Sequence, residues 1–317
     1  MANNLKLRVI GLPTAITDKL ANHNIVTVQD FLTLNFIELQ RKTGLTYQKL
    51  SAISTEVNNF VSPRGIPVSQ LLQPSHAIFN GELDVFLKGG ITHGHITEFS
   101  GAPGLGKTQL CLQLAFSNTL HGGASNGVLY IDTEGAFNSS RLLDIAVHKY
   151  GTTTQEELES SLNRIHLWHP HSLKDIIDKL ISIEVFIIKE RIGLLIIDSM
   201  GSIVRRDFGA EKSVERGTQM CSLSSSLKRI AHTFNLAVVV TNHVTAKMET
   251  SKDLNGGSTS IPALGPSWSH WINSRLHLFI SQNARRLIVS KSPEIPEIIV
   301  NYCISKGGIE IQSGGCS

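Results

Sequence analysis

The stretch Gly101-Ala-Pro-Gly-Leu-Gly-Lys-Thr108 decides how this chain folds. It is a complete G-x-x-x-x-G-K-[ST] pattern, the phosphate-binding P-loop, in which glycines let successive backbone N–H groups point at phosphate oxygens. The motif follows an expected strand and opens an expected helix, whose positive N-terminal end favours anions. We expect Lys107 to reach the β- and γ-phosphates and the Thr108 hydroxyl to bind Mg²⁺. The sequence therefore predicts an ATP and Mg²⁺ site that includes Gly101, Ala102, Pro103, Gly104, Leu105, Gly106, Lys107, Thr108 and Gln109.

Strands that alternate with helices surround this loop, and such alternation is typical of a mainly parallel α/β sheet. The expected strands are 95–99, 128–132, 165–168, 193–198 and 237–242. The expected helices are 107–120, 139–149, 172–190 and 214–234. After Arg275 the chain becomes rich in strands, at 275–280, 286–290 and 297–304.

A small all-α unit precedes the sheet. Apolar residues recur at helical spacing between residues 5 and 60, with turns at Gly11-Leu12-Pro13 and Gly44-Leu45-Thr46, which is typical of a helix-hairpin-helix unit. Such a unit contacts DNA in some proteins and has a docking or purely structural role in others. The stretch Ser62-Pro-Arg-Gly-Ile-Pro67 indicates a linker. The predicted domains are a helical domain at 1–61, a linker at 62–77 and an ATPase domain at 78–317.

Composition excludes several classes of protein. The net charge of +3 is too small to indicate a polyanionic partner by itself. We expect no signal peptide, because Met1 to Asn4 lead straight into a polar, amphipathic segment. The most apolar stretch, 181–204, is interrupted by charged residues and predicts no membrane span. The four cysteines are Cys111, Cys221, Cys303 and Cys316. They lie far apart and form no CxxC pair, so the sequence predicts neither a zinc site nor a disulfide framework. This fits a reducing compartment.

Two acidic strand ends are expected to complete the nucleotide site. Leu194-Leu-Ile-Ile-Asp198 ends an apolar strand with a carboxylate that can hold Mg²⁺ through its water shell, or can simply cap a turn. Tyr130-Ile-Asp132-Thr-Glu134 ends another strand with two carboxylates. We expect this strand to adjoin the P-loop strand, so that Glu134 faces the γ-phosphate and polarises the attacking water. The alternative for Glu134 is helix capping or a surface turn.

Arg141 lies on the helix expected after the strand that carries Glu134. Its guanidinium group could stack on the adenine ring. On the sequence alone, Arg141 is nearly as well explained as a plain surface arginine.

Taken in this order, these residues resemble the eukaryotic branch of the RecA-like recombinases over almost the whole chain. Three segments are closer to the recombinase paralogues than to the strand-exchange enzyme: 101–111, 238–243 and 262–270. The chain looks most like the B-type paralogue, with the D-type second, in five segments: 5–11, 28–32, 43–47, 198–205 and 291–293. The resemblance implies an α/β fold, with a RecA-like P-loop ATPase core and a mainly parallel sheet, preceded by a small all-α helix-hairpin-helix-like domain.

The resemblance also implies a function. It implies a nuclear ATPase subunit, with Glu134 and Lys107 as catalytic residues, in a heteromeric paralogue complex that helps to load the recombinase on single-stranded DNA during double-strand-break repair. The implied direct partner is the C-type paralogue, with D-type and X-type subunits further along the assembly. The alternative is a structural adaptor that binds ATP with little turnover. A metabolic kinase or a hexameric helicase is disfavoured, because neither carries this N-terminal unit.

Two departures from the family pattern bear on assembly and coupling. The strand-exchange enzyme has a Phe-x-x-Ala element in its linker that docks on the next subunit, and residues 62–74 contain none. We therefore expect defined hetero-assembly and not a homo-filament. His243 stands where the recombinases usually have the glutamine that senses the γ-phosphate, which places their coupling between ATP and DNA in doubt here.

Two segments are the expected DNA loops. Residues 205–215 contribute Arg205, Arg206 and Lys212, and residues 244–261 contribute Lys247 and Lys252. Five acidic residues offset these cations: Asp207, Glu211, Glu215, Glu249 and Asp253. Apart from Phe208, neither loop offers an aromatic platform for bases, so any DNA contact would be backbone-dominated and salt-sensitive.

Lys291 is a further candidate. In the resembling recombinases, the loop aligned with 290–296 caps ATP bound to the adjacent protomer, where an acidic residue works through a bound monovalent cation. Lys291 stands at that position, and its ammonium group could replace the cation. The alternative is a solvated lysine in a loop between strands.

Overall fold

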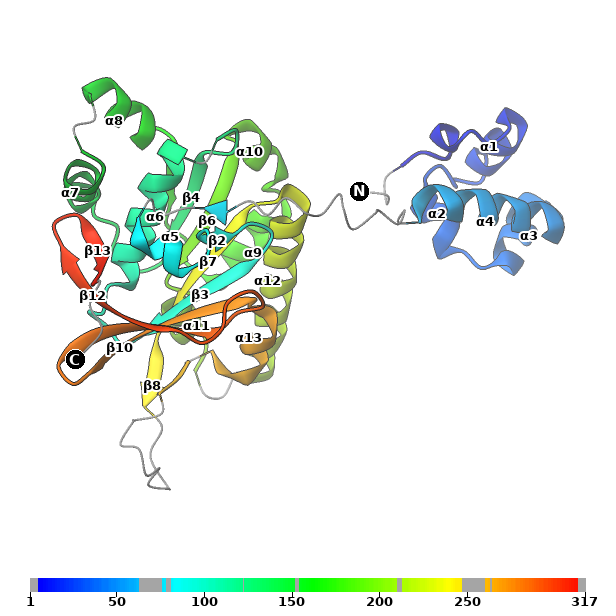
Figure 1. The fold of residues 1–317 in the computed structure, drawn as a ribbon. Coiled ribbons are helices and arrows are strands. Elements are labelled where there is room, and N and C mark those ends of the chain that lie inside the picture. Colours follow the sequence, from blue (N-terminus) through cyan, green and yellow to red (C-terminus); the bar gives the residue numbers. More distant parts are fainter. Residues whose placement is uncertain are drawn as a thin grey trace. The chain divides into compact units, whose positions relative to one another are not determined.

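The computed structural model describes residues 5–62, 76–77, 81–121, 123–151, 154–209, 213–246, 260–262 and 264–312. The chain divides into two compact units, Met1–Gln73 and Pro74–Ser317, and each is described by itself (Figure 1). No helix in the described part of the chain is both long and apolar enough to span a membrane.

The first unit is helical. It contains η2 (Leu7–Ile10), α1 (Thr14–Ala21), α2 (Val28–Thr33), α3 (Phe36–Thr43) and α4 (Tyr47–Val61). Capping boxes begin α2 and α3, because each N-cap side chain and the acid three residues later satisfy each other's free N–H groups. Gly44 ends α3 in the left-handed conformation that glycine adopts without strain. The helices pack around buried side chains that include Leu20, Phe31, Leu39 and Leu50.

The second unit is built on one sheet, ordered β13-β12-β11-β10-β3-β7-β6-β4-β5. The central strands β10, β3, β7, β6, β4 and β5 are parallel, and the pairs among β10, β11, β12 and β13 are antiparallel. Their bounds are β3 (Ile96–Gly101), β4 (Gly127–Asp132), β5 (Ile165–Trp168), β6 (Ile192–Asp198), β7 (Ala237–Asn242), β10 (Ser274–Ser281), β11 (Ala284–Lys291), β12 (Ile299–Ser305) and β13 (Gly308–Ile311). This arrangement confirms the predicted α/β class with a mainly parallel sheet.

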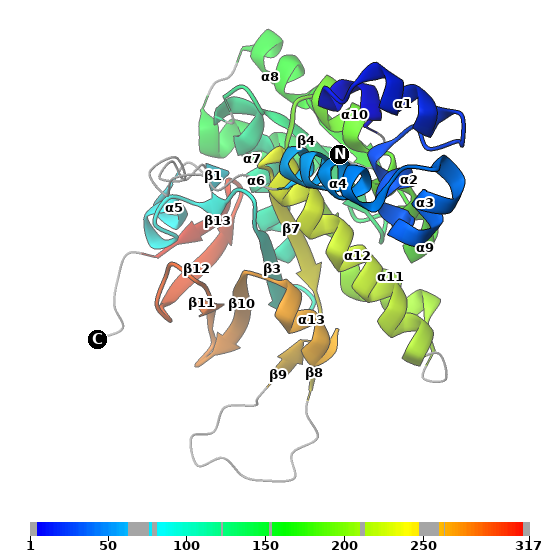
Figure 2. The same ribbon diagram turned by 90° about the vertical axis from the view of Figure 1, so that its right-hand side faces the viewer.

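Helices cover both faces of this sheet (Figures 1 and 2). Every residue of β3, β4, β6 and β7 is buried, as expected for parallel strands between two helical layers. One apolar cluster includes side chains of α6 (Lys107–His121) and α7 (Ser139–Tyr150). The other includes side chains of α9 (Leu173–Ile181) and α12 (Ser213–Phe234).

The remaining elements are short. They are β1 (His76–Ala77), α5 (Glu82–Phe86), β2 (Ile91–Thr92), α8 (Gln155–Leu162), α10 (Glu184–Lys189), α11 (Met200–Asp207), β8 (Val244–Ala246), β9 (Ser260–Pro262) and α13 (Gly265–Trp271). The antiparallel strands β8 and β9 lie side by side beyond β7 (Figure 2). They form the two ends of the expected loop 244–261, whose Lys247, Glu249, Lys252 and Asp253 lie outside the described residues.

The structure corrects the predicted helix 172–190. It forms two helices, α9 and α10, because the chain leaves the helical conformation at Ser182. The break allows both Ile183 and Ile187 to be buried in the core that α9 also contacts. A continuous apolar pattern concealed this change of direction.

The expected loop 205–215 also needs correction. Arg205 and Arg206 belong to α11, residues 213–215 belong to α12, and Glu211 and Lys212 lie outside the described residues. Phe208 is buried against the core that contains α12, so its ring is not available as a platform for bases.

The predicted neighbour of the P-loop strand was wrong. The P-loop strand β3 lies between β7 and β10, and both β6 and β7 separate it from β4. Glu134 nevertheless lines the same cavity as the P-loop, because parallel strands bring their carboxyl ends to one edge of the sheet.

Candidate nucleotide-binding site

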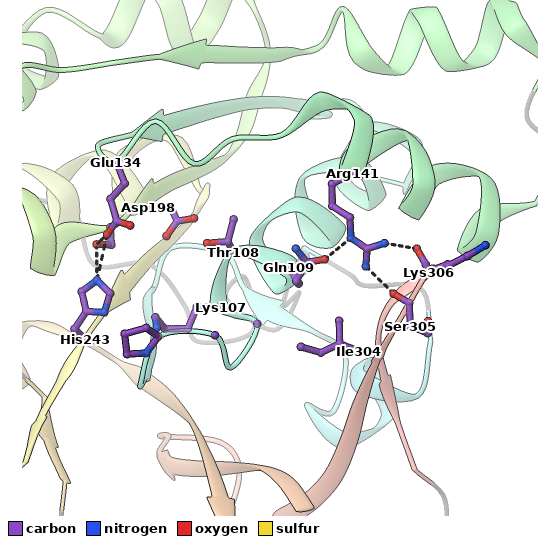
Figure 3. Close-up of a pocket in the computed structure, with 14 residues that line it drawn as sticks. Lys107, Thr108, Gln109, Glu134, Arg141, Asp198, His243, Ile304, Ser305 and Lys306 are labelled. Atoms are coloured by element: carbon purple, nitrogen blue, oxygen red, sulfur yellow. Dashed lines mark hydrogen bonds and ion pairs between the residues drawn. The ribbon is translucent and has the colours of Figure 1, made fainter.

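A cavity of about 690 Å³ lies at this edge of the sheet, beside the P-loop. Its volume falls within the range of about 300–1,000 Å³ that is usual for small-molecule sites. Figure 3 shows Glu134 and His243 at one end, Arg141 at the other, and Lys107 and Thr108 between them. The lining residues are Pro103, Gly104, Gly106, Lys107, Thr108, Gln109, Glu134, Arg141, Asp198, Ser199, His243, Ile304, Ser305 and Lys306.

Two positions show why the P-loop backbone needs glycine. Gly106 has φ +96°, and a Cβ atom there would lie 3.0 Å from the side chains of both Ile304 and Ile309. A Cβ atom on Gly101 would lie 2.6 Å from the Leu278 carbonyl oxygen on the neighbouring strand. The loop therefore keeps a close backbone cradle that fits the phosphates of a nucleotide. Ala102 is exposed within the loop, and Leu105 is buried beneath it.

Lys107 begins α6 and is almost fully buried. Its Nζ donates hydrogen bonds to the carbonyl oxygens of Gly101 and Ala102, each at 2.9 Å. Burial lowers the pKa of Lys107, and the nearby carboxylates of Asp198 and Glu134 act in the opposite direction. A buried ammonium group that donates to loop carbonyls is well suited to donate hydrogen bonds to anionic phosphate oxygens.

Asp198 ends β6 and lines the same cavity as the P-loop. Its carboxylate accepts hydrogen bonds from the Tyr130 hydroxyl at 2.9 Å and the Thr241 hydroxyl at 2.5 Å. These two donors fix its orientation, and Thr108 lines the same cavity. An oriented carboxylate and a threonine hydroxyl are oxygen donors of the kind that Mg²⁺ accepts, directly or through water.

The two carboxylates after β4 have different environments. Asp132 is buried, and its oxygens accept hydrogen bonds from the backbone N–H groups of Glu134, Gly135, Ala136 and Phe137. It therefore shapes the turn 133–137. That turn presents the Glu134 side chain to the cavity.

The carboxylate of Glu134 is held by three side chains. Its Oε1 accepts hydrogen bonds from the hydroxyls of Ser199, at 2.6 Å, and Ser202, and lies 3.1 Å from His243 Nε2. Burial alone would raise the pKa of Glu134, but these hydrogen bonds outweigh it and lower that pKa below its usual value. Glu134 is therefore ionised at neutral pH, as a residue that polarises water must be.

Arg141 closes the other end of the cavity. Its guanidinium group donates to Gln109 Oε1 at 2.6 Å and to the carbonyl oxygens of Ser305 and Lys306 at 2.6 and 2.8 Å. The edge of the guanidinium is thereby fixed by the turn between β12 and β13. The sequence gives no sign of this contact, because the turn carries no motif and follows Arg141 by more than 160 positions.

Lys291 and Arg206 do not line this cavity. Lys291 Nζ donates to the carbonyl oxygens of Ser269 and Ile272, each at 2.7 Å, and so satisfies the C-terminal end of α13. Arg206 likewise donates to backbone carbonyls, those of Thr133 and His171.

Comparisons with known proteins agree with this fold. The family model described as Rad51 matches residues 77–312, and the model described as "XRCC3/RpoA-like, helix-hairpin-helix domain" matches residues 7–58. "DNA repair protein RAD51 homolog 2" of Homo sapiens is 33% identical over 97% of this chain and 89% of that protein. The protein of the same name in Arabidopsis thaliana is 28% identical over 99% of this chain and 92% of that protein. "DNA repair protein RAD51 homolog 4" of Bos taurus is 32% identical over 90% of each chain.

Proposed function

This chain belongs to the Rad51 family, and on that premise we propose that it is an ATP-binding and ATP-hydrolysing recombinase paralogue that acts in homologous-recombination repair of double-strand breaks. Within the family we assign it to the B-type paralogues. The similarity to proteins named RAD51 homolog 2 in three organisms supports this assignment.

One observation carries the proposal of hydrolysis: Lys107, Thr108, Glu134 and Asp198 all line one cavity. Lys107 would bind the β- and γ-phosphates and stabilise the charge that develops on them. Glu134 would accept a proton from the attacking water or orient it. Thr108 and Asp198 would hold Mg²⁺, which would supply positive charge to neutralise the phosphates. Arg141 would orient the adenine base at the far end.

We propose the C-type paralogue as the direct partner, with D-type and X-type paralogues in a larger nuclear complex that helps to load the recombinase filament on single-stranded DNA. The absence of a Phe-x-x-Ala element between residues 62 and 74 supports hetero-assembly over a homo-filament. The Phe99–Ala102 and Phe234–Ala237 matches do not count, because Phe99 and Ala237 are buried in the sheet.

A structural adaptor that binds ATP without turning it over is the second candidate. The contact of His243 with Glu134 favours it, because His243 occupies the position of the family's phosphate-sensing glutamine. Co-purification with the C-type paralogue, followed by measurement of ATP turnover with and without single-stranded DNA, separates the two functions. We expect a stable complex whose turnover single-stranded DNA increases; a stable complex that binds ATP without turnover would favour the adaptor.

We also predict that Lys291 acts on nucleotide bound between this subunit and a neighbour. Burial, with Arg275 and Lys228 nearby, lowers the pKa of Lys291, and its ammonium group is already close to two carbonyl oxygens. In the assembled complex, Lys291→Asp is expected to make ATP turnover depend on potassium, whereas the wild type shows no such dependence. Lys291→Ala serves as the control for loss of the contacts with α13. Identical potassium profiles for all three chains would refute the prediction.

A further inference from the structure

Helix α11 contacts the Glu134 turn with both of its ends. At its first turn, the hydroxyls of Ser199 and Ser202 donate to the Glu134 carboxylate. At its last turn, Arg206 Nη1 donates to the carbonyl oxygen of Thr133 at 3.3 Å. The Thr133 carbonyl and the Glu134 side chain therefore both accept hydrogen bonds from this helix and its N-cap residue.

The guanidinium group of Arg206 also joins two loops. Its Nη2 donates to the carbonyl oxygen of His171, in the loop after β5, at 2.8 Å. The neighbouring Asp207 accepts a hydrogen bond from the backbone N–H of Leu173 at 2.5 Å, and its other oxygen lies 3.6 Å from Arg206 Nε. The end of α11 is thus tied to the loop after β5 as well as to the turn after β4.

The Thr133 carbonyl belongs to the same peptide unit as the N–H of Glu134. Asp132 Oδ1 accepts a hydrogen bond from that N–H at 3.0 Å. Arg206 and Asp132 therefore hold the two polar ends of one peptide plane. Because the peptide unit is planar, holding both ends restricts its orientation, and with it the position of the Glu134 Cα atom that carries the side chain.

We propose that Arg206 is a positioning residue for Glu134. It lies outside the nucleotide cavity and keeps the peptide between Thr133 and Glu134 in the orientation that hydrolysis requires. The proposal rests on the proposed ATP hydrolysis. It assigns to Arg206 a role within the ATPase unit, whereas the sequence suggested only a contact with DNA.

The chemistry of arginine suits this role. Its planar guanidinium presents several N–H donors at fixed angles and can serve two carbonyl oxygens at once, whereas lysine is a point charge on a flexible stem. A lysine at this position would hold the two carbonyls less rigidly, because its ammonium group lies at the end of a flexible stem, and an alanine would hold neither. Small displacements of catalytic groups by distant mutations can cost up to about 10²-fold in rate.

The test compares Arg206→Ala, Arg206→Lys and a matched control, Arg229→Ala, in the full chain without DNA. Arg229 has a similar exposed fraction, 46% against 48% for Arg206, and donates to Glu184 at 2.6 Å, but it does not line the nucleotide cavity. For Arg206→Ala we expect kcat to fall about 10-fold with KM and ATP affinity unchanged. Arg206→Lys should recover part of that loss, and Arg229→Ala should match the wild type. An unchanged kcat in Arg206→Ala would overturn the proposal.

A second measurement does not depend on turnover. Hydrogen exchange of the backbone amides at 135–137, which Asp132 binds, should be faster in Arg206→Ala than in the wild type or in Arg229→Ala. Equal exchange in the two alanine variants would also overturn the proposal. If the wild type binds ATP but does not hydrolyse it, the proposed function fails on its own. The exchange rates then decide whether Arg206 holds the turn.

Discussion

A chain carrying Lys107→Ala is expected to lose ATP binding and to keep its fold. The Lys107 ammonium is buried among loop carbonyls and is the positive charge that the motif places against the β- and γ-phosphates. Truncating one partner of a buried, hydrogen-bonded charge pair typically costs about 2–5 kcal/mol. That corresponds to a loss of about 30- to 5,000-fold in affinity. Titration with a fluorescent ATP analogue, together with urea unfolding, measures both parts of the prediction.

The fold should survive because, among the described residues, Lys107 Nζ donates its hydrogen bonds to carbonyl oxygens of its own loop. Burial lowers the pKa of Lys107, which means that folding desolvates this charge, and removing it relieves that cost. Lys189→Ala is the matched control: Lys189 is exposed, pairs with Glu190 at 3.0 Å and lies outside the cavity. Wild-type affinity for ATP in Lys107→Ala would contradict the assignment of the site.

The P-loop could be predicted from the sequence because its chemistry is contiguous. One strand, one turn and the start of one helix supply the glycines, the lysine and the threonine, so short-range spacing fixes their geometry. Asp198 and Glu134 could be predicted for a related reason. Both follow apolar strands, and parallel strands deliver such residues to one edge of the sheet, even though the predicted neighbour of β3 was wrong.

The surroundings of these residues could not be predicted, because they depend on contacts between distant segments. Nothing in the sequence near Glu134 indicates that Ser199, Ser202 and His243 converge on its carboxylate. The guanidinium of Arg141 is fixed by carbonyl oxygens of the turn between β12 and β13, and backbone carbonyls leave no signal in residue identity. The sequence predicts a loop at Arg206, which lies in α11, because the charged end of a short helix resembles a loop.

Glu134→Gln is expected to bind ATP as the wild type does and to hydrolyse it at least about 10²-fold more slowly, which is the lower range for loss of a general base. Glutamine has nearly the same size, and its carbonyl oxygen can still accept the hydrogen bonds of Ser199 and Ser202. The change therefore removes the proton-accepting carboxylate and preserves most of its surroundings. Single-turnover hydrolysis and equilibrium ATP binding, measured on the same preparation, separate the two effects.

Two further comparisons make this result specific to the carboxylate. Ser202→Ala removes a hydrogen-bond donor to Glu134 but keeps the carboxylate, so it should slow hydrolysis less than Glu134→Gln does. The hydrogen bonds that lower the pKa of Glu134 also keep it ionised at neutral pH. Its contribution to turnover should therefore be complete at neutral pH and should fall only as the pH drops through that lowered pKa. Unchanged turnover in Glu134→Gln would mean that another residue orients the water. His243, whose Nε2 lies 3.1 Å from Glu134 Oε1, would then be the first residue to mutate.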